Sequence, residues 1–222
     1  MKKFFITALV GAFVFAVMGT AGAVMVSFVS PLSGVDNTLG WSTGDGTVTL
    51  GTSFTILSGN GTVYGYYGVE PWNLTQRGTR GLGVVEGEND EIDSQELASS
   101  EMIKILFNGP QTIRYLEVRS LFTSDAGWGG TEQGAVDFYR NGILLYTQDL
   151  TGVESGGNGV LALTPYATVD ELRFYVPAGL PANVRSNSEF ALAKLNAVIP
   201  EPSSMLLLGM GILGLFGLRR KT

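Results

Sequence analysis

The stretch Gly134-Ala-Val-Asp-Phe-Tyr-Arg-Asn141-Gly142-Ile-Leu-Leu-Tyr-Thr-Gln-Asp149 decides the fold class, because it has the form of a β-hairpin. Asn141 and Gly142 tolerate the two positive φ values of a type I′ turn, whose twist suits a two-residue connection between antiparallel strands. β-branched and aromatic residues, which favour strands, lie on both sides of this turn. The stretch therefore predicts two paired strands, over 135–139 and 143–148.

Strand signals of the same kind continue on both sides of this hairpin. Leu172, Phe174 and Val176 alternate with Arg173 and Tyr175, which is typical of a strand with one buried face and one wet face. Further strands are predicted over 24–29, 47–57, 62–67, 102–107, 113–122, 160–163, 171–176 and 190–198. We therefore predict an all-β fold, a jelly-roll-like antiparallel β-sandwich over 24–198, because parallel strands would need crossover helices.

One long segment departs from the strand pattern. Residues 74–100 lack alternation between apolar and polar residues, and they are rich in glycine and then in carboxylates. We predict a long loop here. Loops of this length inside a compact domain usually bind a ligand or are disordered.

The beginning of the chain has the features of an export signal. Lys2 and Lys3 precede an apolar run, and Ala21 and Ala23 flank Gly22 in a small-residue cleavage site. These features predict a secretory signal peptide over 1–23, which implies passage through the Sec export machinery. An uncleaved signal anchor is the alternative reading.

The end of the chain, over 199–222, combines a Pro-Glu-Pro triplet, an apolar run at 205–218 and a basic tail. The residues that define these features are Pro200, Glu201, Pro202, Arg219 and Arg220. The prolines favour an extended backbone and end the preceding fold. The apolar run predicts a single transmembrane helix with its basic end in the cytoplasm. Because this helix would be about 21 Å long against a hydrocarbon core of about 30 Å, a buried core helix is the alternative.

This order of Pro-Glu-Pro, apolar helix and basic tail resembles the PEP-CTERM sorting signal of exported surface proteins. The resemblance implies that an exosortase, a membrane-embedded thiol transpeptidase, recognises Pro200, Glu201 and Pro202 and removes the tail. It also implies a Gram-negative host that makes exopolysaccharide. The resemblance concerns delivery of the chain through the inner membrane to the cell surface or matrix. It leaves the role of the body open.

Composition limits the chemistry that the body can perform. The chain has neither cysteine nor histidine, which removes Ser-His-Asp and Cys-His nucleophilic systems and zinc sites with His or Cys ligands. Five of the 14 Lys and Arg residues and one of the 20 Asp and Glu residues, Glu201, lie in the two terminal signals. Nine basic residues therefore face 19 acidic residues in the rest of the chain, a net charge of about −10. Such an acidic surface repels nucleic acid, which is therefore not an expected partner.

An acidic segment at 86–101 predicts a cation site. Its carboxylates would repel one another in a folded loop, and calcium, which takes six to eight oxygen ligands, would relieve that repulsion. The candidate calcium ligands are Asp90, Glu91, Asp93 and Glu96. The spacing differs from that of an EF-hand, and a solvated acidic loop is the alternative. A wider stretch is also similar to a segment found in the bodies of exosortase-dependent proteins, which carries no established activity. The residues that carry this resemblance are Gly81-Leu-Gly-Val84, Asp90-Glu-Ile-Asp93, Glu96 and a strand that ends in Phe107.

Aromatic residues provide the other candidate site. Tyr64, Tyr66, Tyr67 and Trp72 lie close together in the sequence, and Trp128 lies in a glycine-rich turn. Aromatic faces stack on sugar rings, so Trp72 and Trp128 are candidate glycan-binding residues, although core packing is the commoner fate of aromatic residues in a sheet.

The sequence thus predicts a structural or adhesive surface protein of a polysaccharide-rich biofilm, with anionic polysaccharide as an expected partner and no enzymatic activity. A stand-alone carbohydrate-binding module is the alternative. A glycoside hydrolase with two carboxylates from the acidic segment is the third reading.

Overall fold

The computed structural model describes residues 22–36, 41–43, 46–84, 91–92, 101–123, 130–153 and 159–198. The chain divides into two compact units: one is Val24–Val198, and the other combines Met1–Ala23 with Ile199–Thr222. The first unit holds almost all of the described secondary structure and is the body of the protein.

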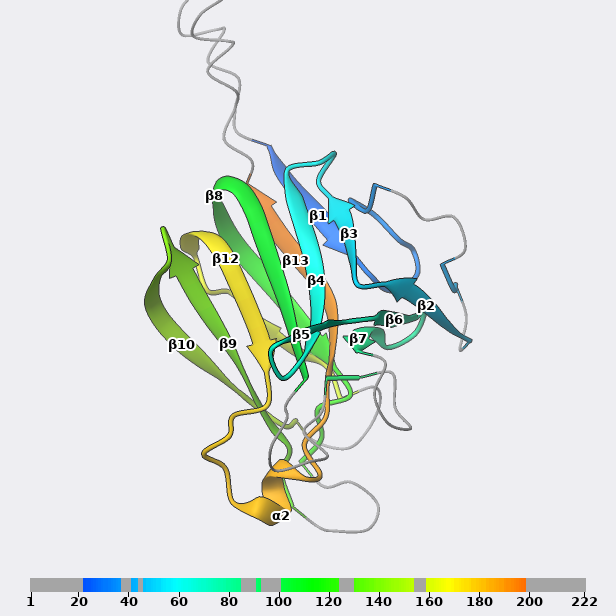
Figure 1. Ribbon diagram of the computed structural model, residues 1–222, viewed down its shortest axis with the longest axis vertical. Coiled ribbons are helices and arrows are strands. Elements are labelled where there is room, and N and C mark those ends of the chain that lie inside the picture. The colour runs from blue at the N-terminus through cyan, green and yellow to red at the C-terminus, as the bar shows by residue number, and fades with distance from the viewer. Residues whose placement is uncertain are drawn as a thin grey trace, which may run out of the picture. The chain divides into compact units, whose positions relative to one another are not determined.

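The body is almost entirely antiparallel β-sheet, which confirms the predicted all-β class (Figure 1). Its one described helix, α2 (Ala182–Arg185), is a single turn. The strands are β1 (Ala23–Ser27), β2 (Thr47–Gly51), β3 (Ser53–Ile56), β4 (Gly61–Tyr67), β5 (Glu70–Trp72), β6 (Leu74–Arg77), β7 (Gly81–Val84), β8 (Glu101–Arg119), β9 (Gln133–Arg140), β10 (Ile143–Thr151), β11 (Leu161–Leu163), β12 (Ala167–Tyr175) and β13 (Ala191–Val198).

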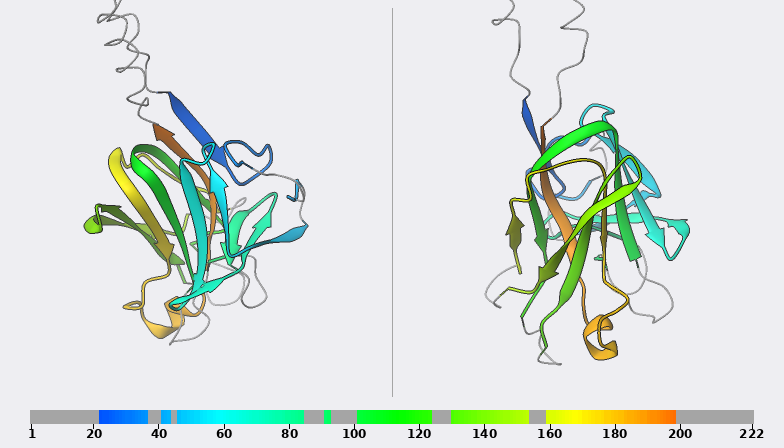
Figure 2. Two further views of the ribbon diagram at one scale, coloured as in Figure 1. Left: turned by 45° about the horizontal axis from the view of Figure 1, so that its top comes forward. Right: turned by 90° about the vertical axis from the view of Figure 1, so that its left-hand side faces the viewer.

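The long strand β8 organises the sheet, because it changes partners along its length. Its first part, Glu101 to Phe107, pairs with β4, whereas its second part, Thr112 to Arg119, pairs with β13. The strand bends between these parts and passes from a front layer to a back layer (Figures 1 and 2). The sequence predicted two strands, over 102–107 and 113–122. This prediction was wrong, because one strand runs from Glu101 to Arg119 through Gly109 and Pro110.

The front layer has the strand order β10-β9-β12-β8-β4, with β3 and β5 both on the outer edge of β4. The back layer continues from the second half of β8 through β13, β7 and β6 to β2, with β1 also on β13 and β11 also on β8. The predicted single strand over 47–57 is therefore two strands: β2 pairs with β6 in the back layer and β3 pairs with β4 in the front.

The core lies between the layers and is built from strand alternation. In β12 and the residue that follows it, Leu172, Phe174 and Val176 have no exposed surface, while Arg173 and Tyr175 point to the other face, as predicted. Four phenylalanines are also fully buried: Phe28, Phe138, Phe174 and Phe190. Burial of each contributes about 1.5–3 kcal/mol, so the inward face fixes which side chains point outward.

The predicted hairpin is confirmed as β9 and β10. Asn141 has a φ of 52° and Gly142 a φ of 74°, the pair of positive values that a type I′ turn needs. On the inward side, the ring of Tyr146 stacks on Phe138 with centroids 4.4 Å apart.

The predicted long loop over 74–100 is wrong for its first part, because β6 and β7 form a hairpin there. All four residues of β7 are buried, so this strand has no wet face and shows no alternation in sequence. Gly81 has a φ of 130°, and a Cβ at this position would clash with the carbonyl oxygen of Leu192. The glycines that argued for a loop instead allow close packing of strands. Residues 85–90 and 93–100 lie outside the described part of the chain.

Candidate functional site

The outward side of the front layer carries a continuous row of large polar and aromatic side chains. Strand register sets this row, because each member is the cross-strand partner of the next. We call it the front row, and its members are Thr147, Asp137, Arg173, Lys104, Tyr64 and Ser53 from β10, β9, β12, β8, β4 and β3. Six strands spaced about 4.8 Å apart give the front row a length of about 24 Å.

Lys104 lies at the centre of the front row, above two tyrosines of β4. Its Nζ is 5.3 Å from the ring centroid of Tyr64 and 4.8 Å from that of Tyr66, both within cation–π range. The two rings are tilted by 43° with centroids 6.5 Å apart. Tyr64 and Tyr66 point to the same face because they are two residues apart on one strand. The three side chains form one outward-facing cluster of aromatic surface with a positive charge.

Arg173 lies beside Lys104 and has two kinds of partner. Its guanidinium lies over the ring of Tyr139, 4.2 Å from the centroid, and its Nε donates to Glu171. Burial acts to lower the pKa of Arg173, but the hydrogen bond and charge of Glu171 outweigh it and raise the pKa. Arg173 is therefore a permanently charged group on this face.

Asp137 completes this half of the front row as a hydrogen-bond acceptor. Its Oδ1 accepts from Thr147 Oγ1 at 2.6 Å and from the Tyr175 hydroxyl at 3.1 Å. Burial, together with the Asp137 charge and hydrogen bond, raises the pKa of Tyr175 to about 12. Asp137, on β9, thus holds a threonine of β10 and a tyrosine of β12 in place.

The structure divides the predicted aromatic group into two pairs. Tyr64 and Tyr66 belong to the outward face of β4. Trp72, on β5, is the cross-strand partner of Gly65, and its ring contacts that of Tyr67 with centroids 5.8 Å apart. Gly65 and Tyr67 alternate with Tyr64 and Tyr66 along β4, so Trp72 is not on the face of the front row. Trp72 keeps 38% of its surface exposed at the sheet edge. Trp128 lies outside the described residues.

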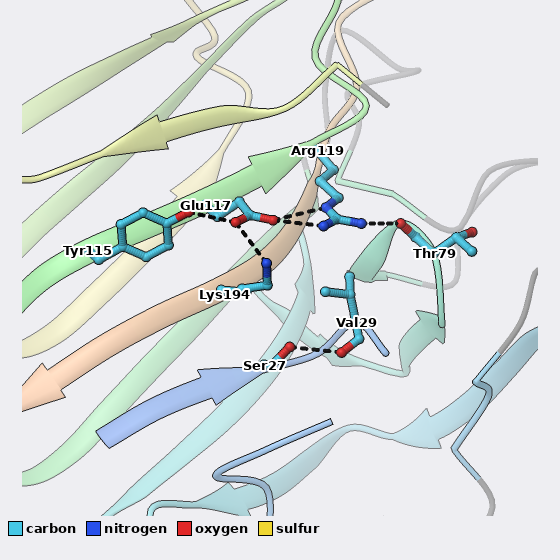
Figure 3. A network of polar contacts seen from close by, with 7 residues as sticks. All are labelled: Ser27, Val29, Thr79, Tyr115, Glu117, Arg119 and Lys194. Atoms are coloured by element: carbon cyan, nitrogen blue, oxygen red, sulfur yellow. Dashed lines mark hydrogen bonds and ion pairs between the residues drawn. The ribbon is translucent and has the colours of Figure 1, made fainter. Parts of the chain in front are cut away.

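A second polar cluster joins β8 to β13 in the back layer (Figure 3). Glu117 is 4% exposed, and its Oε2 accepts from the Tyr115 hydroxyl at 2.6 Å and from Lys194 Nζ at 3.0 Å. Its Oε1 accepts from Arg119 Nε at 3.0 Å, and Arg119 also donates to the Thr79 carbonyl oxygen at 2.8 Å.

The pKa values in this cluster follow from its contacts. Burial alone would raise the pKa of Glu117, but hydrogen bonds from Tyr115, Lys194 and Arg119 lower it below its ordinary value of 4.5. Burial, followed by the Glu117 hydrogen bond and charge, raises the pKa of Tyr115 to about 12. Because Tyr115, Arg119 and Lys194 all donate hydrogen bonds to Glu117, the cluster stabilises the pairing of β8 with β13. The sequence analysis did not identify this cluster.

Of the candidate calcium ligands, only Glu91 lies in the described part of the chain. Its side chain is fully buried, and its Oε1 pairs with Arg80 Nη1 at 2.5 Å. Glu91 therefore already has a cationic partner, supplied by the β6–β7 hairpin. Within the described residues, no group of three or more acidic side chains is arranged to hold a metal ion. The other predicted ligands, Asp90, Asp93 and Glu96, lie outside these residues, and the calcium site stays a prediction.

Most residues of the two predicted terminal signals also lie outside the described part of the chain. Ala23 begins β1, whereas Ala21 and the sorting residues Pro200, Glu201, Pro202, Arg219 and Arg220 are not described. Among the described residues there is no helix of the length and hydropathy needed to span a membrane.

Comparison with known families identifies the tail. Residues 198–221 match the family described as the PEP-CTERM protein-sorting motif, which confirms the resemblance read from the sequence. The motif implies processing by an exosortase, and with it export and transient anchoring in the membrane.

The body is not identified by the same comparisons. No curated protein matches the chain. Two solved structures of fucose-binding modules from Streptococcus pneumoniae are distantly similar. The first, SpX-3, is 14% identical, with a TM-score of 0.25, and covers 44% of this chain and 61% of its own. The second is 9% identical, with a TM-score of 0.29, and covers 83% and 94%. Neither similarity is close enough to define the fold or the ligand of this chain.

Proposed function

We propose that the body of this exported protein holds extracellular polysaccharide at the cell surface, and so has a structural or adhesive role in a polysaccharide-rich biofilm. In this proposal the Sec machinery exports the chain, and exosortase processes it at the Pro-Glu-Pro motif. The body, 24–198, then remains in the surface or matrix layer. The body would adhere by binding carbohydrate, the activity that the sequence analysis gave as the alternative function.

The front row is the observation that carries this proposal. Polysaccharide binding needs an extended surface with exposed aromatic faces and fixed polar groups. Tyr64, Tyr66 and Lys104 supply such a cluster at the centre of the sheet, and Arg173 with Tyr139 extends it across the neighbouring strands. A length of about 24 Å suits several sugar rings of an extended chain better than a single small molecule.

We propose a binding role rather than a catalytic one. The two carboxylates nearest the centre of this face, Asp137 and Glu171, are engaged as acceptors by Thr147, Tyr175 and Arg173. A glycoside hydrolase needs two carboxylates that are free to act on the scissile bond, whereas these two hold neighbouring side chains in place. The arrangement therefore favours positioning of side chains over acid catalysis.

Affinity electrophoresis of the full-length protein in gels that contain a panel of neutral and acidic polysaccharides tests this function. We expect retardation by at least one polymer, and a roughly fivefold loss of affinity in Tyr66→Ala, because one lost aromatic contact costs about 1 kcal/mol. Tyr166→Ala is the matched control, since Tyr166 is 71% exposed and lies on β12's N-terminal side, away from β4.

Two results would contradict the proposal. One is unchanged mobility of the wild type in every polymer, with an intact melting transition. The other is equal loss of affinity in Tyr66→Ala and Tyr166→Ala. Loss in Trp72→Ala alone would move the contact to the β5 edge and remove the front row from the function.

A further inference from the structure

The two cations of the front row face each other across neighbouring strands. Lys104 on β8 and Arg173 on β12 are direct register partners, and both point outward. Like charges directly opposite on a sheet are destabilising. The pair lies in a chain whose body is strongly acidic, so cations are scarce in it. Two adjacent cations at the centre of one face call for a compensating negative charge.

The described residues provide that charge for one cation only. Arg173 is paired with Glu171, and Asp137 is its register partner on the other side. Within the described ranges, Lys104 forms no ion pair or hydrogen bond with an acidic side chain. Its contacts there are the faces of Tyr64 and Tyr66. The tyrosine faces hold the ammonium group in position without neutralising it.

We propose that the polysaccharide bound by the front row is acidic, and that Lys104, with Arg173 beside it, binds a carboxylate or sulfate group of the sugar chain directly. This inference rests on the proposed function and specifies its ligand class. Tyr64 and Tyr66 position the ammonium group and provide aromatic surface for the sugar rings beside it. This contact needs no calcium ion.

Electrostatics sets the conditions for this interaction. The body repels an acidic polymer at long range, so binding depends on a local contact with Lys104 and Arg173 rather than on the overall field. Added salt screens the repulsion and the attraction together. Affinities of different polymers or variants should therefore be compared at one ionic strength, because a change in salt concentration alters both effects at once.

The test compares one sugar backbone with and without its charge. Full-length protein is run in gels with polygalacturonate and with its fully methyl-esterified form, both in EDTA, and with dextran sulfate and dextran. We expect retardation by an acidic polymer, with affinity about tenfold weaker in Lys104→Gln and restored in Lys104→Arg. Arg114→Gln is the matched control, because it removes one exposed cation that lies over Tyr166, 5.4 Å from its ring centroid.

The outcomes separate this inference from the proposed function. Equal retardation by the acid and its ester, or an unchanged affinity of Lys104→Gln for the acid, overturns the acidic ligand and leaves polysaccharide binding in place. An equal loss in Lys104→Gln and Arg114→Gln also overturns it, because net charge would then explain the effect. Retardation by dextran sulfate alone, lost in Lys104→Gln, supports the inference with sulfate as the anion. Absence of binding to any polymer removes both proposals.

Discussion

The sharpest stability prediction concerns Glu117 in the back layer. Glu117→Gln keeps the size of the side chain and removes its charge, so Lys194 and Arg119 lose the carboxylate that each contacts at 3.0 Å. Breaking a buried ion pair on one side costs about 3–5 kcal/mol. The side chains of Lys194 and Arg119 are 28% and 18% exposed, which lets water recover part of this cost. We therefore expect a loss of about 2–3 kcal/mol in the free energy of unfolding.

Urea unfolding of the full-length protein, followed by tryptophan fluorescence, measures this loss. With a denaturant slope of about 2 kcal/mol per molar, the midpoint should fall by about 1 M. Glu70→Gln is the matched control, because Glu70 is exposed on β5 and its change should stay within about 0.5 kcal/mol. If the two variants unfold at the same midpoint, the desolvation of Glu117 cancels its pairing and the reasoning fails.

Three more predictions concern Glu117, the turn between β9 and β10, and the sorting motif. Because folding lowers the pKa of Glu117, its contribution is present above its ordinary pKa of 4.5 and is lost as pH falls through the lower folded value, so urea midpoints should fall less on acidification in Glu117→Gln than in the wild type. Gly142→Ala should cost about 1–2 kcal/mol in the same assay, because Gly142 has a φ of 74°, while Gly179→Ala, at an open position without a positive φ, should cost less than half as much. Replacement of Pro200 and Pro202 by alanine should leave the protein in the membrane fraction with its tail attached, and normal processing by mass spectrometry would contradict the role of the sorting motif.

Sequence patterns predicted the elements that have one wet face or a distinctive turn. The β9–β10 hairpin could be predicted because Asn141 and Gly142 suit the positive φ values of its turn. Strand β12 could be predicted because apolar and polar residues alternate along it. The β6–β7 hairpin was missed because β7 is buried on both faces, which removes alternation. Its glycines indicated a loop, although Gly81 serves close strand packing instead.

The front row could not be predicted, since register decides it. Lys104 and Arg173 lie on strands far apart in sequence and become neighbours only when β8 pairs with β12. Proximity in sequence grouped Trp72 with the tyrosines of β4, but strand alternation separates Trp72 from Tyr64 and Tyr66. One part of the face that carries the front row could have been predicted, because Tyr64 and Tyr66 are two residues apart on one strand and therefore point to the same face.

Lysine footprinting shows directly whether polysaccharide contacts the front row. The span 24–198 contains two lysines, Lys104 in the front row and Lys194 in the Glu117 cluster, so one protein carries its own control. The full-length protein is acetylated with and without saturating acidic polysaccharide, and modification at each lysine is measured by mass spectrometry. We expect the polymer to protect Lys104 and to leave the acetylation rate of Lys194 unchanged. Equal rates at Lys104 with and without bound polymer would contradict the proposed contact.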